Sequence, residues 1–569
     1  MDRRGAGTEG AGWLWRRPAA ALAELRAAAG VLGPALAESV DLEAARRTLR
    51  AWIEHRRRAL LDEDGAADRD DARPRAAVEV LEGLCGRRRE RRVGFSTLAL
   101  LRRALGGDLT GIAAGFLLEI AALLHDATGT TDAAGLGALD DAIGREPGAG
   151  AEGSERLDAV GAEVWRQIGR FPTGLDNAVI ERRDVARRRI LAAFGGSDED
   201  WDDPRWHRTN SLWRTPAALD RLRELVDLRA AESEAIEAYV RAGGSLVITP
   251  FQLSLLDLEG FDPEVDDAIR ARVLLPWAGA EASPTRAGVE TVVRGGPLVA
   301  ALDLLCAPRG VRTEEALDRA LDSLAESAAI TDVRIVGGDP LLLADAVIER
   351  IMGRLAAMPH VTHVRWETRA LVRTPMRITP ALAGILGRYH EPGRRSVAVV
   401  AHVASALEVT PELVEAAARL RCQGVGVYND LRFAAPSSRR FEAVATRLAL
   451  ARAGVEPGAE TIRAGQPPLA RLLQERGEEA SLSPDLLRAD ELLLDAPGSQ
   501  VDRLVDVSSR ELVAIRGDGR RVYMWRPQAR AGAPTRTWLH VDAAVADYLD
   551  DLAERGEDPD AYASIWHYR

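Results

Sequence analysis

Strand-and-helix pairs in close succession predict an α/β fold, with a partial parallel (β/α) barrel in the second half of the chain. From about residue 296, short apolar runs alternate with longer amphipathic patterns. Each such pair implies a right-handed crossover between parallel strands. Five or six units are too few for a full eight-stranded barrel, so we expect an open, partial one.

The elements before the barrel are predicted to be mainly helical. Residues 1–165 form a helical N-terminal region with a Gly- and Ala-rich linker at 128–154. Residues 166–295 form a helical lead-in that contains the segments WDDPRW and ITP, and the Trp-rich stretch around WDDPRW is predicted to be irregular.

The barrel itself is assigned to residues 296–475. Its strands are predicted from the runs PLVAALDLLC, DVRIVGG, HVTHVRWE, SVAVVAH and GVGVYND, each followed by a helical pattern. Residues 476–569 form a C-terminal segment with a DAPG turn and a β-hairpin, because GDG separates two alternating runs.

Composition excludes several classes of function. The chain has 569 residues and a formal charge of −12, which argues against general nucleic-acid binding. No window is long and apolar enough for a membrane helix, so we expect no membrane association. Three widely spaced cysteines, Cys85, Cys306 and Cys422, imply no disulfide framework, and the expected location is the cytoplasm. All 75 basic residues are arginine, so the chain has no side-chain amine.

The loops after the strands are the predicted place for a ligand, because barrels carry their chemistry there. Gly337, Gly338 and Asp339 follow the second strand, where glycines allow close approach and the carboxylate can accept bonds from an ammonium. The alternative for Asp339 is a helix cap. His402 ends its strand and is predicted to face the barrel mouth.

Four arginines recur at every fourth position near the end of the third strand: Arg365, Arg369, Arg373 and Arg377. They could bind a carboxylate or phosphate, or form internal salt bridges with Glu367 and its neighbours. His360 and His363 are expected to make structural hydrogen bonds, and we predict no metal site.

Together these segments resemble the lysine 2,3-aminomutase family of radical S-adenosylmethionine enzymes. The resemblance runs from about Trp201 to Arg526 through WDDPRW, LVITPFQLSLLD, VRIVGGDPLLL, MPHVTHVRWETR, PMRITPAL, ILGRYH, AHVASALEVTPE and LLLDAPGS. It implies a partial barrel with an iron–sulfur cluster on a CxxxCxxC loop and S-adenosylmethionine at the GGD turn. It also implies pyridoxal phosphate on a lysine that follows the DAPG turn.

The chain departs from this family at the chemical groups. Cys306 is a single remnant at the cluster loop, whereas a cluster with an open iron needs three thiolates. No lysine follows the DAPG turn, and the substrate-binding pair after the fifth strand is not recognisable. We therefore expect the iron–sulfur cluster and pyridoxal phosphate to be absent, with S-adenosylmethionine as the candidate cofactor at Gly337, Gly338, Asp339, His402, Arg369 and Arg377.

The resulting hypothesis is a degenerate family member that does not perform aminomutation and acts as a binding, regulatory or assembly partner. The alternative is an amino-acid 2,3-aminomutase, or another S-adenosylmethionine-dependent enzyme, whose cluster is completed by another subunit. Candidate partners are an active family paralogue, a second copy of the chain, or a small-molecule ligand. No catalytic residue is assigned from the sequence.

Overall fold

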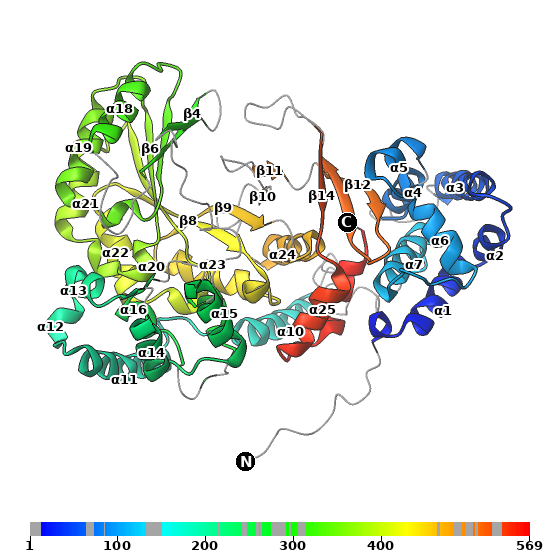
Figure 1. Ribbon diagram of the computed structural model, residues 1–569, viewed down its shortest axis with the longest axis horizontal. Helices are drawn as coiled ribbons and strands as arrows, with labels where there is room; N and C mark the ends of the chain where they lie inside the picture. Colours follow the sequence, from blue (N-terminus) through cyan, green and yellow to red (C-terminus); the bar gives the residue numbers. More distant parts are fainter. Residues whose placement is uncertain are drawn as a thin grey trace, which may run out of the picture.

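The structure is a computed structural model that describes most of the chain, in two lobes (Figure 1). A large α/β lobe, green and yellow, lies beside a helical lobe, blue, that packs on a small orange sheet. The described residues are 13–63, 73–84, 86–131, 151–213, 216–241, 247–257, 261, 264–274, 292–294, 298–304, 314–463, 467–482, 492–495, 504–506, 510–525 and 537–568.

A nine-stranded sheet forms the centre of the α/β lobe, in the strand order β11-β10-β9-β8-β7-β6-β5-β4-β3. Strands β4 to β10 are parallel, whereas the edge strands β3 and β11 pair antiparallel. The sheet is curled and open, which confirms the predicted partial barrel (Figure 1). The strands are Val292–Arg294 (β3), Val299–Asp303 (β4), Asp332–Val336 (β5), His363–Thr368 (β6), Ser396–Ala401 (β7), Gly426–Phe433 (β8), Glu456–Arg463 (β9), Leu492–Asp495 (β10) and Leu504–Asp506 (β11).

Helices cover the convex face of this sheet, as the alternation along the strands requires. Val333 and Ile335 of β5 are fully buried among them, whereas Arg334 between these two residues is only half-buried on the concave side. Thr379 and Thr410 cap two of the helices by accepting bonds from backbone N–H groups. The covering helices are Glu314–Ala325 (α18), Asp345–Ala356 (α19), Pro380–Arg388 (α21), Pro411–Arg421 (α22) and Glu442–Arg452 (α23).

Strand β9 is not among the predicted strands, because Pro457 and Gly458 interrupt its pattern. The structure places both at an irregularity in the β8–β9 pairing, between Asn429 and Leu431. A Cβ at Gly458 would lie 2.3 Å from Asp430 Oδ1, so only glycine fits there. The neighbouring Ala459 N–H donates to the same oxygen at 2.8 Å, which holds the bulge in place.

The segment around WDDPRW is ordered into short helices, and the prediction of an irregular stretch is wrong there. Ser197 forms a capping box with Asp200, and Asp203 accepts from the Arg205 N–H at 2.8 Å. The tryptophans interrupt the usual apolar periodicity, so the sequence does not reveal these capped helices. One of the tryptophans, Trp201, is buried against His207. The lead-in elements are Asn177–Phe194 (α11), Asp198–Trp201 (α12), Pro204–Thr209 (α13), Leu212–Trp213 (β1), Pro216–Leu225 (α14), Ala230–Arg241 (α15), Val247–Ile248 (β2), Pro250–Leu253 (α16) and Asp267–Val273 (α17).

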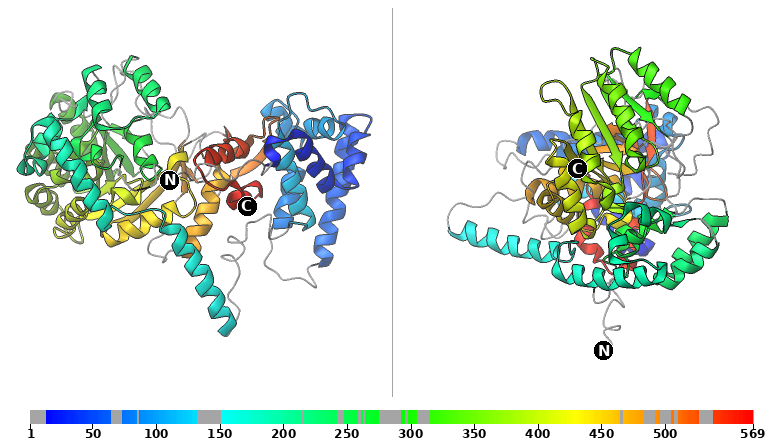
Figure 2. Two further views of the ribbon diagram at one scale, coloured as in Figure 1. Left: turned by 90° about the horizontal axis from the view of Figure 1, so that it is seen from below. Right: turned by 90° about the vertical axis from the view of Figure 1, so that its left-hand side faces the viewer.

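A helix replaces the end of the predicted linker. Helix α10, Ala151–Ile168, begins within the range 128–154, and residues 132–150 lie outside the described residues. In Figure 2 this helix, in cyan, extends away from the body of the protein.

The helical lobe shares one apolar core with the C-terminal part of the chain. Buried Arg521 donates to buried Glu119 at 2.7 Å, and the Thr97 hydroxyl donates to the Ile515 carbonyl at 3.1 Å. The predicted hairpin around GDG is present as β12 and β13. The elements are Leu14–Arg16 (η1), Pro18–Ala29 (α1), Leu32–Ala37 (α2), Leu42–Glu63 (α3), Arg73–Leu84 (α4), Arg87–Val93 (α5), Thr97–Leu105 (α6), Ala114–Thr128 (α7), Arg510–Ile515 (β12), Arg521–Trp525 (β13), Trp538–Val541 (β14), Val545–Glu554 (α25) and Pro559–Trp566 (η8).

Helix α24, Leu469–Leu482, lies between the two lobes in Figure 1. Its partners come from both sides, since it packs on α23 of the barrel and on η8 of the C-terminal part. Among the described helices, none combines the length and the apolar surface that a bilayer-spanning helix needs.

Candidate ligand site at the barrel mouth

Charged side chains line the concave face of the curled sheet. Arg334 of β5 donates to Glu367 of β6 at 2.6 Å, and Arg365 donates to Asp332 at 3.1 Å. Burial raises the pKa of Asp430 on β8 to about 6, and the nearby Glu367 adds to the rise. Closed barrels fill this face with branched apolar residues, so its polarity here favours a ligand-binding surface.

The predicted glycine turn lies at the mouth, where β5 ends. Gly337 and Gly338 have φ angles of 95° and 64°, which favour glycine at both positions. Asp339 follows and is buried, and its Oδ1 accepts a hydrogen bond from the Thr368 hydroxyl of β6. The alternative role as a helix cap is not seen, because Asp339 makes no side-chain cap bond to the short helix Pro340–Leu342 (η2).

The two carboxylate oxygens of Asp339 have different surroundings. Within the described part of the chain, its buried Oδ2 has no hydrogen-bond partner. Burial raises the pKa of this carboxyl, while Arg373, Thr368 and Arg369 act in the opposite direction. The free oxygen is thus an acceptor beside guanidinium groups.

His402 lies at the end of β7 and is half-buried. Desolvation lowers its pKa to about 3, with further contributions from the cations Arg432, Arg369 and Arg272. The ring is therefore neutral at pH 7. Its own loop is held by Asn429, which exchanges two hydrogen bonds with Val403 at 2.6 and 3.2 Å.

Arg272 of α17 completes this cationic group and was missed from the sequence. It donates to the His402 carbonyl at 2.6 Å and forms an ion pair with buried Glu408. Desolvation and the charges of Arg369 and Arg373 lower its pKa to about 9. Nothing in its local pattern points to the mouth, because it lies on a lead-in helix that only the tertiary fold brings there.

The four regularly spaced arginines do not form one cluster. Arg369 and Arg373 lie near Asp339 and Arg272, and Arg373 also donates to the Val247 carbonyl at 3.2 Å. Arg365 pairs with Asp332, while Arg377 donates to Asp345 at 2.6 Å and to the Leu343 carbonyl at 2.7 Å. A spacing of four would align side chains on one continuous helix, but here it spans β6, the short helix Ala370–Arg373 (α20) and the 3-10 helix Pro375–Arg377 (η3).

The cysteines do not supply a cluster site within the described part of the chain. Cys422 is exposed at the end of α22, just before β8 begins. It therefore lies near the N-terminal ends of the strands, whereas the mouth lies at their C-terminal ends. Cys306 lies outside the described residues, as does Cys85, which follows α4 in the sequence. His360 makes a structural hydrogen bond, in which its Nε2–H donates to the Leu324 carbonyl at 3.2 Å.

The mouth therefore offers an acceptor, several cations and a neutral imidazole. A carboxylate oxygen without a partner suits an ammonium group, and guanidinium groups suit a carboxylate or phosphate. A zwitterionic amino-acid group matches both features at once.

Comparison with known proteins identifies relatives along nearly the whole chain. No family model matches the sequence. It is 32% identical over 558 residues to an uncharacterized KamA family protein of Methanocaldococcus jannaschii, covering 86% of this chain and 88% of that protein. It is 28% identical over 273 residues to a glutamate 2,3-aminomutase of Clostridioides difficile and 29% identical over 255 residues to an L-lysine 2,3-aminomutase of Clostridium subterminale.

These two aminomutase alignments are shorter. They cover 44% and 41% of this chain, and 62% and 59% of the two enzymes. The chain thus spans less than two thirds of each aminomutase, whereas it matches the archaeal protein over most of its length.

Proposed function

This chain belongs to the KamA family, and we propose that it binds S-adenosylmethionine or a related amino-acid ligand at the barrel mouth without performing aminomutation by itself. The observation that carries the binding part is Asp339, a buried carboxylate with one oxygen lacking a described partner and with Arg369 and Arg373 close by. The ammonium and carboxylate of an amino-acid group complement these charges.

The side chains of this protein fit S-adenosylmethionine, but they do not fit pyridoxal phosphate or an iron–sulfur cluster, the other two cofactors that the family resemblance implies. Gly337, Gly338 and Asp339 would receive its amino group, and the arginines its carboxylate. Pyridoxal phosphate needs an amine for its covalent link, and the chain contains no lysine. An iron–sulfur cluster needs three thiolates, whereas the sequence places one cysteine, Cys306, at the expected loop.

Calorimetry with S-adenosylmethionine tests the binding. We expect the parent protein to bind and Asp339→Ala to lose at least tenfold in affinity, because a hydrogen bond to a charged group is lost. Asp345→Ala is the matched control, since Asp345 is a half-exposed carboxylate that pairs with Arg377, and its removal should leave binding unchanged. Equal heats from parent and Asp339→Ala, or none from either, would contradict the proposal.

The second candidate function is an enzyme whose cluster is completed by another subunit, and the same acceptor at Asp339 supports it, because such an enzyme would also have to hold the amino group of S-adenosylmethionine. Anaerobic protein reconstituted with iron and sulfide separates the two. We expect no visible cluster absorption, no β-lysine from lysine and no rearrangement of glutamate. Turnover with release of 5′-deoxyadenosine would overturn the proposed inactivity, and turnover only after a second protein is added would establish the alternative.

A further inference from the structure

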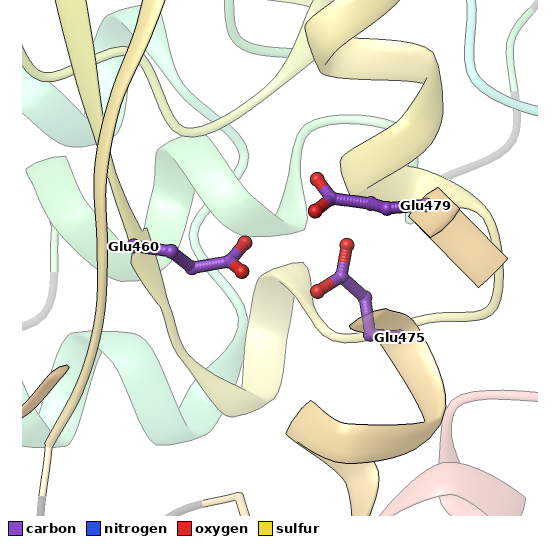
Figure 3. Close-up of side chains that lie close together, drawn as sticks. All are labelled: Glu460, Glu475 and Glu479. Carbon is purple, nitrogen blue, oxygen red and sulfur yellow. The ribbon is translucent and has the colours of Figure 1, made fainter. Parts of the chain in front are cut away.

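Three buried glutamates meet where the last barrel units join α24, away from the residues at the mouth. Glu460 extends from β9, and Glu475 and Glu479 lie one turn apart on the same face of α24 (Figure 3). Their exposed fractions are 0%, 0% and 1%. Carboxylate oxygens of all three lie within 4.8 Å of one another.

Only part of this carboxylate cluster is satisfied by the protein. Arg447 of α23 donates to Glu460 Oε1 at 3.2 Å and to Glu479 Oε1. Among the described residues, the other oxygen of Glu460, the other oxygen of Glu479 and both oxygens of Glu475 have no hydrogen-bond partner. Within the part of the chain that the structure describes, Glu475 is thus a fully buried carboxyl without a hydrogen-bond partner, and Figure 3 shows it directed toward the other two.

Charges from the surrounding elements do not offset the cluster completely. Arg447 is the guanidinium bonded to it, and Arg476 lies 3.8 Å from Glu479, which is too long for a hydrogen bond. Arg471 acts on Glu475 through space, yet its guanidinium donates to Glu478 at 3.3 Å. A buried charge without such compensation takes up protons or binds a counter-ion.

Protonation is the response of the cluster when nothing is bound. Burial raises the pKa of Glu475, with a further contribution from Glu460. Burial and the same Glu460 charge raise the pKa of Glu479 to about 7. A cation would replace these protons.

We propose that Glu460, Glu475 and Glu479 bind one hard divalent cation, of the class of Mg²⁺ or Mn²⁺, through the carboxylate oxygens that the protein leaves without partners. Such cations prefer oxygen ligands, and the cluster contains neither the cysteine nor the histidine that zinc usually takes. The cation would fasten α24 to β9 and so tie the barrel to the helix between the lobes. This site is independent of the ligand at the mouth.

Mn²⁺ is the probe, added to the full-length protein after metal removal by chelation. Electron paramagnetic resonance titration should show one tightly bound Mn²⁺ per chain, and the melting temperature should rise with Mn²⁺ and with Mg²⁺. Glu475→Gln should weaken Mn²⁺ binding at least tenfold while keeping the fold, because the amide replaces a protonated carboxyl of the same shape. Glu456→Gln, on the same strand but half-exposed and paired with Arg421, should bind Mn²⁺ like the parent.

The parent protein alone supplies a second readout. At pH 7, Mn²⁺ binding at this cluster should release protons, measured by calorimetry in buffers of different ionisation enthalpy. Failure of the parent to bind Mn²⁺ at millimolar concentration would overturn the proposal and leave a proton-sharing cluster. Equal affinity in folded Glu475→Gln would likewise overturn it by placing the ion elsewhere.

Discussion

The barrel mouth and the carboxylate cluster are two charged regions with opposite imbalances. At the mouth, guanidinium groups outnumber the carboxylates beside them. Two carboxylates, those of Asp339 and Glu408, lie near the three arginines Arg272, Arg369 and Arg373. In the carboxylate cluster, the three glutamates share one directly bonded guanidinium, that of Arg447. The sign of the imbalance indicates what each region binds: a ligand with an anionic group at the mouth and a cation at the cluster.

Burial separates the two regions further. Arg369 and Arg373 are only half-buried, so water screens part of their mutual repulsion. The glutamates and Arg447 are almost fully buried, and their charges interact in a medium of low dielectric constant. Changes in the cluster should therefore affect stability most, whereas changes at the mouth should affect ligand binding most.

Removal of the guanidinium from the carboxylate cluster gives the largest expected effect. Arg447→Met should lower the free energy of unfolding by about 3–5 kcal/mol, because it leaves buried carboxylates without their charged partner. Arg373→Met at the mouth should cost about 1 kcal/mol, since the hydrogen bond to the Val247 carbonyl is lost while repulsion with Arg272 is relieved. Urea unfolding of both variants measures the difference, and equal losses would contradict the distinction between the regions.

The sequence predicts the mouth better than the cluster for a physical reason. The glycine turn and Asp339 are local features, since a strand end followed by two glycines and an acidic residue can be recognised without tertiary contacts. Arg272 reaches the mouth only because α17 packs there. Likewise, QERGEEAS (474–481) in α24 has the composition of a solvated helix face, and only the tertiary packing of α24 against α23 and η8 buries Glu475 and Glu479.

The fold shows the same limit. Strands with clear alternation, such as β5 and β6, are predicted at nearly their observed bounds. Strand β9 is not predicted, because Pro457 and Gly458 break the apolar alternation of its sequence. The structure requires them at the bulge, where the backbone passes close to Asp430. Close tertiary approaches therefore decide both the missed strand and the missed charged residues.

The free energy of unfolding should depend on pH differently at the carboxylate cluster and at the mouth, and the cluster should give the larger change. The folded pKa of Glu479 is about 7, above the ordinary value of 4.5 for a glutamate, so the folded state binds a proton more tightly than the unfolded state. Its contribution is fully present below pH 4.5 and is lost as the pH rises through 7. In chelated protein, Glu479→Gln should reduce this fall by about 3 kcal/mol, measured as the free energy of unfolding in urea at several pH values.

In the parent protein, saturating Mn²⁺ should suppress the fall of the unfolding free energy with rising pH, because the cation takes the place of the protons. The half-exposed Glu456 provides the control, and Glu456→Gln should change the free energy of unfolding by less than about 0.5 kcal/mol at every pH. A slope unaffected by Glu479→Gln would show that this carboxyl titrates normally in the folded protein.

His402 should give the opposite slope, and the smallest of the three effects. Its folded pKa is about 3, below the ordinary value of 6.5 for a histidine, so between these pH values the unfolded state binds the additional proton. The contribution of His402 is therefore fully present above pH 6.5 and is lost as the pH falls toward 3. Since the ring is only half-buried, solvent reduces the expected contribution to about 2 kcal/mol. His402→Gln should remove it, so that parent and variant differ less in unfolding free energy at pH 4 than at pH 7. If the difference grew as the pH fell, the imidazole would be protonated in the folded protein, and the mouth would not be the cation-rich region described above.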